Sequence, residues 1–328
     1  MKRILLVRLD GVGDALALVP LVAALRDAGH VVGALLATRN ADAFAADTFS
    51  WRHLVERIPW PQHGSTPQTY RRALEEARTC GYDVALVASE EPEAYHFAKR
   101  ACIAERVGFV NGMEKPLKTV WAASMLTRWI VRPASARRHG EHEVETLFRL
   151  GKGLHKEARP TKDVARLRPL VTEHPPAFHG RVVIQLTEKL HRLGLDTEKL
   201  RAGFRAVAQS YASIGVAQPS EAEAARSLAD ECGFDVETME NMSQWKAIIA
   251  GAGAVLTPDS GAAHVAGMTG TGCVDLFADG TCAERSLRRW YPWASERTWP
   301  IAVTPRVADR FADHVRAGIA YVSGNAAA

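Results

Sequence analysis

The stretch that most constrains the fold runs from Gly253 to Ala266 and reads GAVLTPDSGAAHVA. Its first part is short, apolar and preceded by a glycine, which is typical of a buried strand. The change to small residues after Pro258 indicates the start of a helix. We therefore expect a strand, a tight turn and a helix in this stretch.

The turn in this stretch is a candidate binding site for an anion. Asp259 or Ser260 can cap the helix, and the small side chains of residues 261–263 leave the first backbone N–H groups open to a ligand. Such N–H groups and the helix dipole attract negative charge. An ordinary capped turn with His264 in the core is the structural alternative.

A second strand-to-helix junction lies near the start of the chain. Residues 4–9 (ILLVRL) predict a first strand, and residues 10–14 (DGVGD) lead into an almost wholly apolar helix through Ala28. A helix that apolar is expected to be buried. Pro20 should kink it near Leu16, because proline cannot donate to the preceding turn.

Gly11 and Gly13 suggest a dinucleotide-binding loop, but two features speak against that interpretation. Leu16 occupies the position of the third glycine, and Asp14 places a negative charge where a pyrophosphate would sit. A carboxylate at a helix start is stabilised by the dipole and suits a general base that takes a proton from a hydroxyl. A helix-capping role for Asp14 is the alternative.

The chain is long enough for two α/β domains, since it has 328 residues of which 47% are hydrophobic. Strands and helices alternate, which favours parallel sheets. The boundary is expected near residue 170, within a stretch (151–179) rich in charge and proline. Further strands are predicted at 31–37, 83–88, 104–109, 181–186, 213–217 and 274–277, and helices at 69–79, 141–150, 196–209, 222–230, 242–250 and 308–321.

Composition excludes several classes of protein. The net charge of +4 is far below that of a dedicated nucleic-acid binder, although residues 1–165 hold 24 Lys and Arg against 19 Asp and Glu and would suit an anionic substrate. No run of about eighteen apolar residues occurs, and the first strand leads directly into charged residues, so we expect a cytoplasmic protein. Five scattered cysteines without a CxxC pair fit reduced thiols.

A basic segment, residues 115–138, holds six Lys and Arg and no acid. Its apolar residues, Trp121 and Trp129 among them, fall at roughly helical spacing. This pattern predicts a basic amphipathic helix at an acceptor site or a membrane surface. A helix that packs its tryptophans on the core is the alternative.

Two other polar stretches differ in what they indicate. Residues 187–192 (TEKLHR) form a basic loop between a predicted strand and helix, which is a further candidate phosphate site. Residues 139–143 (HGEHE) lack the HExxH spacing of a zinc-binding helix. We therefore predict no metal site.

Two motifs taken together resemble the lipopolysaccharide heptosyltransferases of glycosyltransferase family nine: LDGVGD (9–14) after the first strand and DSGAAHVA (259–266) near the end. RVGF (106–109), HEVE (142–145) and RWYPW (289–293) also match, so the resemblance covers nearly the whole chain. It implies an α/β fold of the GT-B type, with two facing Rossmann-like domains. Residues 1–170 would bind the acceptor, residues 171–305 the donor, and a last helix (306–328) would pack back on the first domain.

The resemblance also implies an activity. Such enzymes are inverting, need no metal or other cofactor, and in the best-known members transfer heptose from the nucleotide-sugar ADP-heptose. The acceptor would be a hydroxyl of an anionic glycan or glycolipid such as the lipopolysaccharide core, with peripheral contact to the inner membrane. No nucleic-acid partner is implied.

Site residues carry over from the matching motifs. Asp14 matches the proposed general base, and residues 259–264 match a DTGxxH-type donor segment with Ser260 for the usual threonine. The family usually has a lysine before an aromatic–proline pair, whereas this chain reads KLHRLG (189–194), so either Lys189 or Arg192 can supply the cation. The donor-binding residues implied are Thr187, Lys189, Arg192, Glu221, Met242, Asp259, Ser260, Gly261, Ala262 and His264, and the acceptor-binding ones are Gly11, Gly13, Lys115 and Lys118.

The residues and the resemblance agree on a mechanism. An inverting transfer needs a base on the acceptor side and a clamp for the departing diphosphate on the donor side, and the two motifs would supply them from opposite domains. Closure of the domains would assemble the site. Two other functions stay open: a relative that uses another nucleotide-sugar or a non-lipid acceptor, and a nucleotide-sugar binding protein without catalysis.

Overall fold

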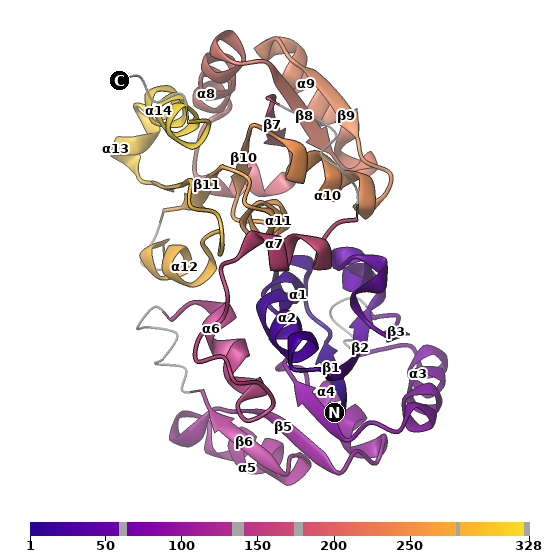
Figure 1. Cartoon of the computed structure of the whole chain (residues 1–328). Helices are drawn as coiled ribbons and strands as arrows, with labels where there is room; N and C mark the ends of the chain where they lie inside the picture. The colour runs from indigo at the N-terminus through magenta and orange to yellow at the C-terminus, as the bar shows by residue number, and fades with distance from the viewer. Residues whose placement is uncertain (59–63, 133–140, 174–179, 280–282, 325–328) are drawn as a thin grey trace. The chain divides into compact units, whose positions relative to one another are not determined.

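The computed structural model describes residues 1–58, 64–132, 141–173, 180–279 and 283–324, and it divides into two compact units. Met1–Thr161 form the first unit and Lys162–Ala328 the second, with the division inside the proline- and charge-rich stretch. Each unit holds one six-stranded sheet whose described pairings are all parallel (Figure 1). The predicted pair of parallel α/β units is confirmed.

The first unit has the strand order β3-β2-β1-β4-β5-β6, so the chain reverses direction across the sheet between β1 and β4. Ligands bind at such switch points, outside the carboxyl ends of the strands. The strands are β1 (Arg3–Arg8), β2 (Val31–Ala37), β3 (Trp51–Val55), β4 (Val84–Val87), β5 (Glu105–Val110) and β6 (Arg128–Val131), and the helices are α1 (Val12–Leu16), α2 (Val19–Asp27), α3 (Pro67–Cys80), α4 (Pro92–Arg100), α5 (Pro116–Met125) and α6 (Glu143–Phe148).

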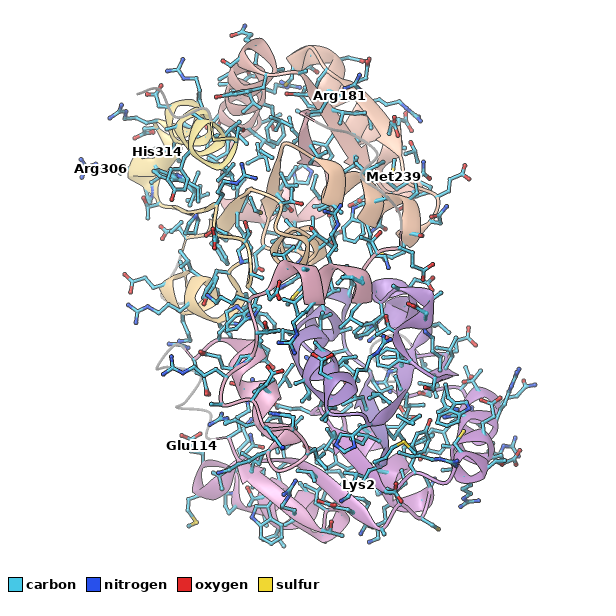
Figure 2. The ribbon with its side chains drawn as sticks, viewed as in Figure 1. Lys2, Glu114, Arg181, Met239, Arg306 and His314 are labelled. Atoms are coloured by element: carbon cyan, nitrogen blue, oxygen red, sulfur yellow. The ribbon has the colours of Figure 1, made fainter. Side chains whose placement is uncertain are left out.

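The second unit repeats this order as β12-β11-β10-β7-β8-β9, with its switch point between β7 and β10. Charged side chains such as Arg181 and Arg306 lie on its surface (Figure 2). The strands are β7 (Val182–Gln185), β8 (Ser213–Ala217), β9 (Asp235–Thr238), β10 (Ala254–Pro258), β11 (Cys273–Ala278) and β12 (Thr298–Val303), and the helices are α7 (Val164–Leu167), α8 (Thr197–Ser210), α9 (Ala222–Cys232), α10 (Met242–Gly251), α11 (Gly261–Thr269), α12 (Ala283–Trp290), α13 (Pro305–Ala308) and α14 (Phe311–Val322).

Sequence patterns predict the inner strands of both sheets and miss the edge strands. All eight predicted strands are inner ones, whereas β3, β6, β9 and β12 are the edge strands of the two described sheets. Inner strands of a parallel sheet are buried on both faces and therefore read as continuous apolar runs. Edge strands such as β9 (DVET) are partly exposed and carry polar residues, so they lack that signal.

Two predicted helices are divided in the structure. The helix after Asp14 separates into α1 and α2, and Pro20 stands in the first turn of α2, where it has no helical N–H bond to lose. The basic segment 115–138 is not one helix, because α5 ends at Met125 and Trp129 lies on the edge strand β6. Residues 133–138 of that segment lie outside the described residues.

The last helix, α14, buries its apolar face in the second unit. Phe311, Val315 and Ile319 belong to the buried core that contains α8 and the inner strands of that unit. Gly203 of α8 permits close packing there, since a Cβ at that position would lie 2.5 Å from Cε1 of Phe311. Within the second unit, α14 therefore packs through complementary apolar surface, and the expectation that the last helix packs back on the first domain stays a prediction.

One charged residue interrupts the core of the second sheet. Asp275 lies in the middle of β11, opposite Thr257 of β10, and has no exposed surface. Neither of its carboxyl oxygens has a hydrogen-bond partner among the described residues. Burial raises the pKa of the Asp275 carboxyl well above its usual range, and the nearby Asp259 raises that pKa further while Lys189 lowers it.

We predict that Asp275→Asn makes the protein more stable at high pH relative to the wild type. In the unfolded chain Asp275 ionises near pH 3.9, whereas the folded protein keeps the proton, so the free energy of unfolding falls as the pH rises above about 4. Asparagine cannot ionise and removes this fall. Chemical unfolding at pH 5 and pH 8 should show a larger gain for the variant at pH 8, and a gain independent of pH would contradict the assignment. Asp235→Asn, at an exposed site on β9, is the control.

Candidate functional site

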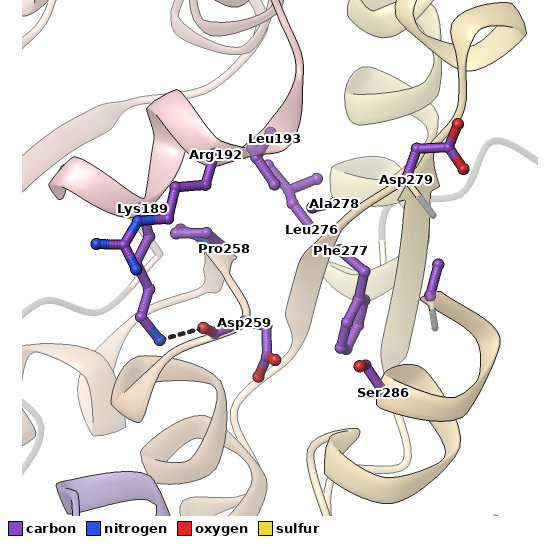
Figure 3. A pocket seen from close by; sticks show the side chains of 11 residues that line it. Lys189, Arg192, Leu193, Pro258, Asp259, Leu276, Phe277, Ala278, Asp279 and Ser286 are labelled. Carbon is purple, nitrogen blue, oxygen red and sulfur yellow. Dashed lines mark hydrogen bonds between the residues drawn. The ribbon is translucent and has the colours of Figure 1, made fainter. Parts of the chain in front are cut away.

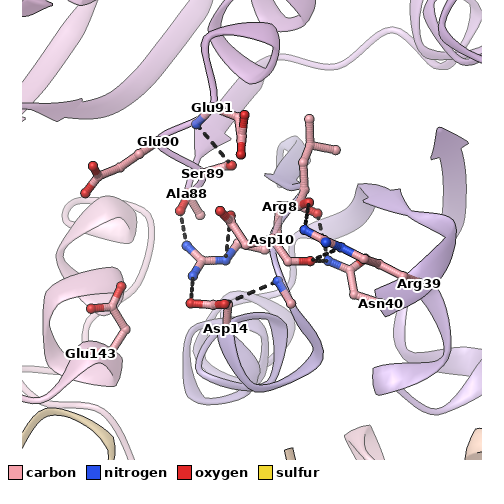
Figure 4. Close-up of polar contacts among 12 residues, drawn as sticks. Arg8, Asp10, Asp14, Arg39, Asn40, Ala88, Ser89, Glu90, Glu91 and Glu143 are labelled. Carbon is pink, nitrogen blue, oxygen red and sulfur yellow. Dashed lines mark hydrogen bonds and ion pairs between the residues drawn. The ribbon is translucent and has the colours of Figure 1, made fainter. Parts of the chain in front are cut away.

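A buried arginine organises the carboxyl end of β1. Arg8 is 4% exposed, and its guanidinium lies 3.2 Å (Nε) from Asp10 Oδ2 and 2.9 Å (Nη2) from Asp14 Oδ1. A third contact runs from Nη1 to the carbonyl oxygen of Ala88, at the end of the neighbouring strand β4 (Figure 4). A buried charge needs such partners to offset its lost hydration. Arg8 therefore ties two carboxylates to the switch point of the first sheet.

Asp14 is held firmly and still reaches solvent. It is the third residue of α1, and its Oδ2 accepts the N–H of Gly11 at 3.2 Å while Oδ1 pairs with Arg8. Its side chain is 36% exposed. A carboxylate with a fixed orientation and an accessible oxygen meets the geometric needs of a general base. The capping contact predicted as the alternative is also present, so both interpretations fit the geometry.

Asp10 differs from Asp14 in its surroundings. Burial raises the pKa of the Asp10 carboxyl, and this effect exceeds the lowering by Arg8 and by a hydrogen bond from Ser89. The backbone beside it is held by Asn40 of the short 3-10 helix η1 (Thr38–Ala43), which follows β2 and donates to the carbonyl oxygens of Arg8 and Asp10 at 3.2 and 2.9 Å. Asp10 thus contributes a partly buried acid, 26% of whose side chain is exposed, beside the candidate base.

The predicted acceptor-binding residues lie at this same edge of the first sheet. Gly11 precedes α1 and uses its N–H for Asp14, while Gly13 lies within α1. Lys115 is exposed before α5, and Lys118 Nζ lies 3.6 Å from Glu90, which follows β4. The glycines therefore follow β1 and the lysines follow β5, and β4, with Glu90 after it, lies between these two strands.

In the second unit, Ser260 caps the helix that follows β10. Its Oγ accepts the N–H of Ala262 at 3.2 Å and lies 2.9 Å from the Thr257 hydroxyl. Gly261 begins α11 and has no positive φ, so the backbone conformation does not itself require glycine there. Of the two predicted caps, Asp259 and Ser260, it is therefore Ser260 that caps α11.

Lys189 and Arg192 both reach the end of β10 but are held differently (Figure 3). Lys189 Nζ donates to the carbonyl oxygen of Asp259 at 2.6 Å, directly before α11. Arg192 pairs with Glu188 at 2.7 Å, and both of these side chains are 69% exposed. The structure therefore anchors Lys189 at the helix start and leaves Arg192 near the solvent.

A cavity of about 450 Å³ adjoins these residues. Its volume is in the range of small-molecule sites. The walls come from the short 3-10 helix η7 (Glu188–Leu193), the ends of β10 and β11, and α12; the lining residues are Lys189, Arg192, Leu193, Pro258, Asp259, Leu276, Phe277, Ala278, Asp279, Ala283 and Ser286.

A second cavity, of about 400 Å³, lies on the other side of η7 beside the ends of β7 and β8. Thr187 and Glu221 line it. Glu221 Oε1 accepts the N–H of Glu188 at 2.7 Å, while its buried Oε2 has no hydrogen-bond partner among the described residues. Met242 begins α10 and is not among the residues that line either of the two cavities.

His264 is buried within α11 and packs edge-to-face on Trp290, with ring centroids 5.6 Å apart. This contact joins α11 to α12, which forms one wall of the first cavity. The structure thus gives His264 a packing partner next to the predicted donor segment.

Three charged residues of these sites were not singled out by the sequence analysis: Arg8, Asp10 and Asp275. Each stands in or directly after an apolar strand (ILLVRLD and CVDLFA). A charge in such a run is expected to be buried, and buried charges are seldom tolerated without a role. That signal was available in the sequence, although the partners of each charge were not.

In the HGEHE segment (139–143), the residues that the structure describes have structural roles. His142 caps α6, with its Nδ1 accepting the N–H of Val144 at 3.1 Å, and Glu143 pairs with Arg132 at 2.6 Å. His139 lies outside the described residues. Within the described ranges, no group of three His, Cys, Asp or Glu side chains is arranged to hold a metal ion.

Comparison with known proteins agrees with this architecture. Residues 200–299 match the family model of glycosyltransferase family 9 (heptosyltransferase), and no curated protein matches the sequence. E. coli heptosyltransferase WaaC with ADP has a TM-score of 0.76 at 16% identity, over 96% of this chain and 99% of that one. E. coli ADP-heptose lipopolysaccharide heptosyltransferase II has a TM-score of 0.68 at 14% identity, over 97% and 98%.

A family 9 glycosyltransferase from Veillonella parvula has a TM-score of 0.68 at 13% identity, over 94% of this chain and 88% of that one. At these identities the structural likeness establishes the GT-B fold, and the family match lies in the second unit, which contains both cavities. Residues 200–299 are thus similar to glycosyltransferase family 9 (heptosyltransferase), and the chain has the fold of the heptosyltransferase structures named above.

Proposed function

We propose that this enzyme transfers heptose from ADP-heptose to a hydroxyl of a lipopolysaccharide-core or related glycan, with inversion and without a metal ion. The observation that supports this most directly is the Lys189 contact to the Asp259 carbonyl at the start of α11. It brings a cation and a helix N-terminus to one cavity at the switch point of a parallel sheet. ADP as the nucleotide is inferred from the similar E. coli WaaC, which was solved with ADP.

On the donor side, the diphosphate would lie at the start of α11. Gly261 and the alanines after it let phosphate oxygens approach the backbone N–H groups, and Lys189 supplies a positive charge. Asp259, whose carboxylate repels phosphate, would face the sugar. Glu221, with a buried oxygen that has no described partner, is suited to accept hydrogen bonds from the ribose hydroxyls.

On the acceptor side, Asp14 would act as the general base. The acceptor oxygen attacks the anomeric carbon on the face opposite the diphosphate, the bond from that carbon to the phosphate oxygen breaks, and ADP leaves with the electron pair. Asp14 takes the proton of the acceptor hydroxyl. Arg8 keeps the carboxylate in place, and Lys115 and Lys118 would attract an anionic acceptor.

Transfer assays with a panel of nucleotide-sugars test this proposal. ADP-heptose should support transfer to a heptose-deficient lipopolysaccharide core, whereas UDP- and GDP-sugars should not. Turnover with a different donor would correct the substrate and leave the reaction type intact. Tight ADP-heptose binding without transfer or hydrolysis would refute the proposed transfer.

We predict that Asp14→Asn lowers kcat by about 10²- to 10⁴-fold, because the amide cannot accept the proton. The Kd for ADP, whose proposed site is in the other unit, should stay within a few fold. Asp47→Asn, an exposed substitution in the first unit, should leave kcat unchanged. Wild-type turnover by Asp14→Asn would remove this residue from the mechanism.

Lys189 and Arg192 form a matched pair for calorimetry. Lys189→Ala should weaken ADP binding by roughly ten- to a hundredfold, the usual loss of a charge-assisted hydrogen bond. Arg192→Ala should have a smaller effect, because its side chain is exposed and already paired with Glu188. The reverse order of the two effects would assign the cation to Arg192.

Activity should persist after treatment with EDTA. The negative charge that develops on ADP would be met by Lys189 and the start of α11, so the reaction does not need a divalent cation. Initial rates are compared before and after chelation, with dialysed enzyme. Loss of the rate in chelator and its recovery with magnesium or manganese would show that a metal ion takes part.

A further inference from the structure

One buried acid of the second unit has no part in the proposed transfer. Asp275 of β11 has no exposed surface, and neither oxygen of its carboxyl group has a hydrogen-bond partner among the described residues. An ionised carboxylate in such a position would lose its hydration without compensation. Burial therefore favours the neutral acid and raises the pKa of the Asp275 carboxyl well above its usual range.

Asp275 stands beside the strand residue that supports the start of α11. It pairs in register with Thr257 of β10, and residues in register on parallel strands point to the same sheet face. Thr257 Oγ1 lies 2.9 Å from the hydroxyl oxygen of Ser260, which caps α11. Thr257 thus connects the strand position of Asp275 to the cap of the helix at which the diphosphate would lie.

The first cavity begins at the residue after Asp275. The next four residues of the chain, 276–279, line it, and so do Asp259 and Lys189 (Figure 3). Of these two charged residues, Asp259 raises the pKa of the Asp275 carboxyl and Lys189 lowers it. Charge in the cavity therefore acts on an acid that does not line it. A diphosphate in the cavity would act in the same direction as Asp259, because it is also negative.

The elements around β11 carry further ionisable side chains. On β11 itself, Cys273 is buried two residues before Asp275, and burial, followed by the nearby Asp275, raises the pKa of the Cys273 thiol. The strand β12 (TWPIAV) has no ionisable side chain. The other elements that contact β11 carry Glu188, Lys189, His191 and Arg192 (η7), His264 (α11), Glu284, Arg285, Arg288 and Arg289 (α12), and Asp313, His314 and Arg316 (α14). Beyond burial, the groups that shift the pKa of Asp275 are Asp259 and Lys189.

We infer that Asp275 couples protonation to donor binding: the enzyme binds the diphosphate when Asp275 is neutral and binds it more weakly when Asp275 is ionised. The inference rests on the proposed function, which places the diphosphate at the start of α11. Negative charge in the cavity opposes the ionisation of Asp275, and an ionised Asp275 opposes negative charge in the cavity. Coupling of this kind is reciprocal, so both effects have the same magnitude.

The direction of the pH effect follows from this coupling. Donor affinity is highest below the pH at which the free protein releases the Asp275 proton, and it falls as the pH rises until the complex releases that proton as well. The full loss equals the coupling factor, roughly 5- to 150-fold for two coupled sites. ADP should show a larger loss than ADP-ribose, because its terminal phosphate carries about one more negative charge above pH 7. The same proton keeps Asp275 neutral when cleavage of the donor places this extra charge on ADP.

Isothermal titration calorimetry of the wild type and Asp275→Asn tests the inference. Between about pH 6.5 and pH 9.5, the ADP affinity of the wild type should fall more steeply than that of the variant, by up to the coupling factor of roughly 5- to 150-fold. Heats measured in two buffers of different ionisation enthalpy should show more proton uptake by the wild type. The titration of ADP itself is common to both proteins and cancels. Equal pH dependence and equal proton uptake would overturn the inference.

Controls separate this coupling from changes in folding. Asp235→Asn, at an exposed site on β9, should bind ADP as the wild type does at each pH. Asp275→Thr is a second neutral variant and should share the flatter profile of Asp275→Asn. Infrared difference spectra of the wild type should contain the carbonyl band of a protonated carboxyl that both variants lack. This band should disappear at high pH and persist there when ADP is bound, and a band that ADP leaves unchanged would contradict the coupling.

Inorganic pyrophosphate distinguishes this inference from the proposed function. If pyrophosphate binds with the Asp275-dependent loss at high pH and ADP binds no more tightly, the inference holds and the nucleotide assignment fails. Coupled ADP binding without turnover of ADP-heptose would refute the proposed transfer and leave the inference standing. Transfer from ADP-heptose with no difference between the wild type and Asp275→Asn in pH dependence would do the reverse. If neither anion binds the wild type, both fail.

Discussion

Parallel strand pairing is the constraint on which both units of this protein depend. Parallel strands bring all their carboxyl ends to one edge of a sheet, where loops and helix starts expose backbone N–H groups and side chains. In the first unit, that edge holds Arg8 and Asp14 at the β1–β4 switch point; in the second, it holds Lys189 and Asp259 at the β7–β10 switch point. One backbone arrangement therefore presents carboxylates in one unit and a cation with a helix start in the other.

The buried charged residues of the two sheets differ in how they are compensated. Arg8 has two carboxylates and a carbonyl oxygen as partners, which offset the cost of its burial and give Asp14 a single orientation. Asp275 has no described hydrogen-bond partner, and burial raises its pKa, so the second sheet carries an acid that tends to stay neutral. Because Asp259 and Lys189, which line the first cavity, both act on that pKa, Asp275 is coupled electrostatically to this cavity although it does not line it.

The edge strands have a different physical situation from the inner ones. A strand at the edge has one free side and is partly open to solvent, so it can carry residues that an inner strand would exclude. In β9 these are acids, and in β6 they are Trp129 and Val131 with Arg128 beside them. Because β6 is only partly covered, it does not form the continuous apolar run by which a strand is predicted from sequence. For the same reason, Trp129 and Val131 remain exposed on the first unit.

By itself, the sequence determined the eight inner strands, the two strand-to-helix junctions, the position of Asp14 and the 259–264 segment, because apolar runs and motif spacing are local properties of the chain. Only the tertiary structure decided that Ser260 caps α11, that Lys189 and not Arg192 contacts Asp259, that Arg8 joins Asp10 to Asp14, and that α14 packs on α8. Each of these depends on which elements become neighbours. Sheet order brings Lys189 to Asp259, and apolar packing brings Gly203 to Phe311. These contacts cannot be predicted from the spacing of the residues along the chain.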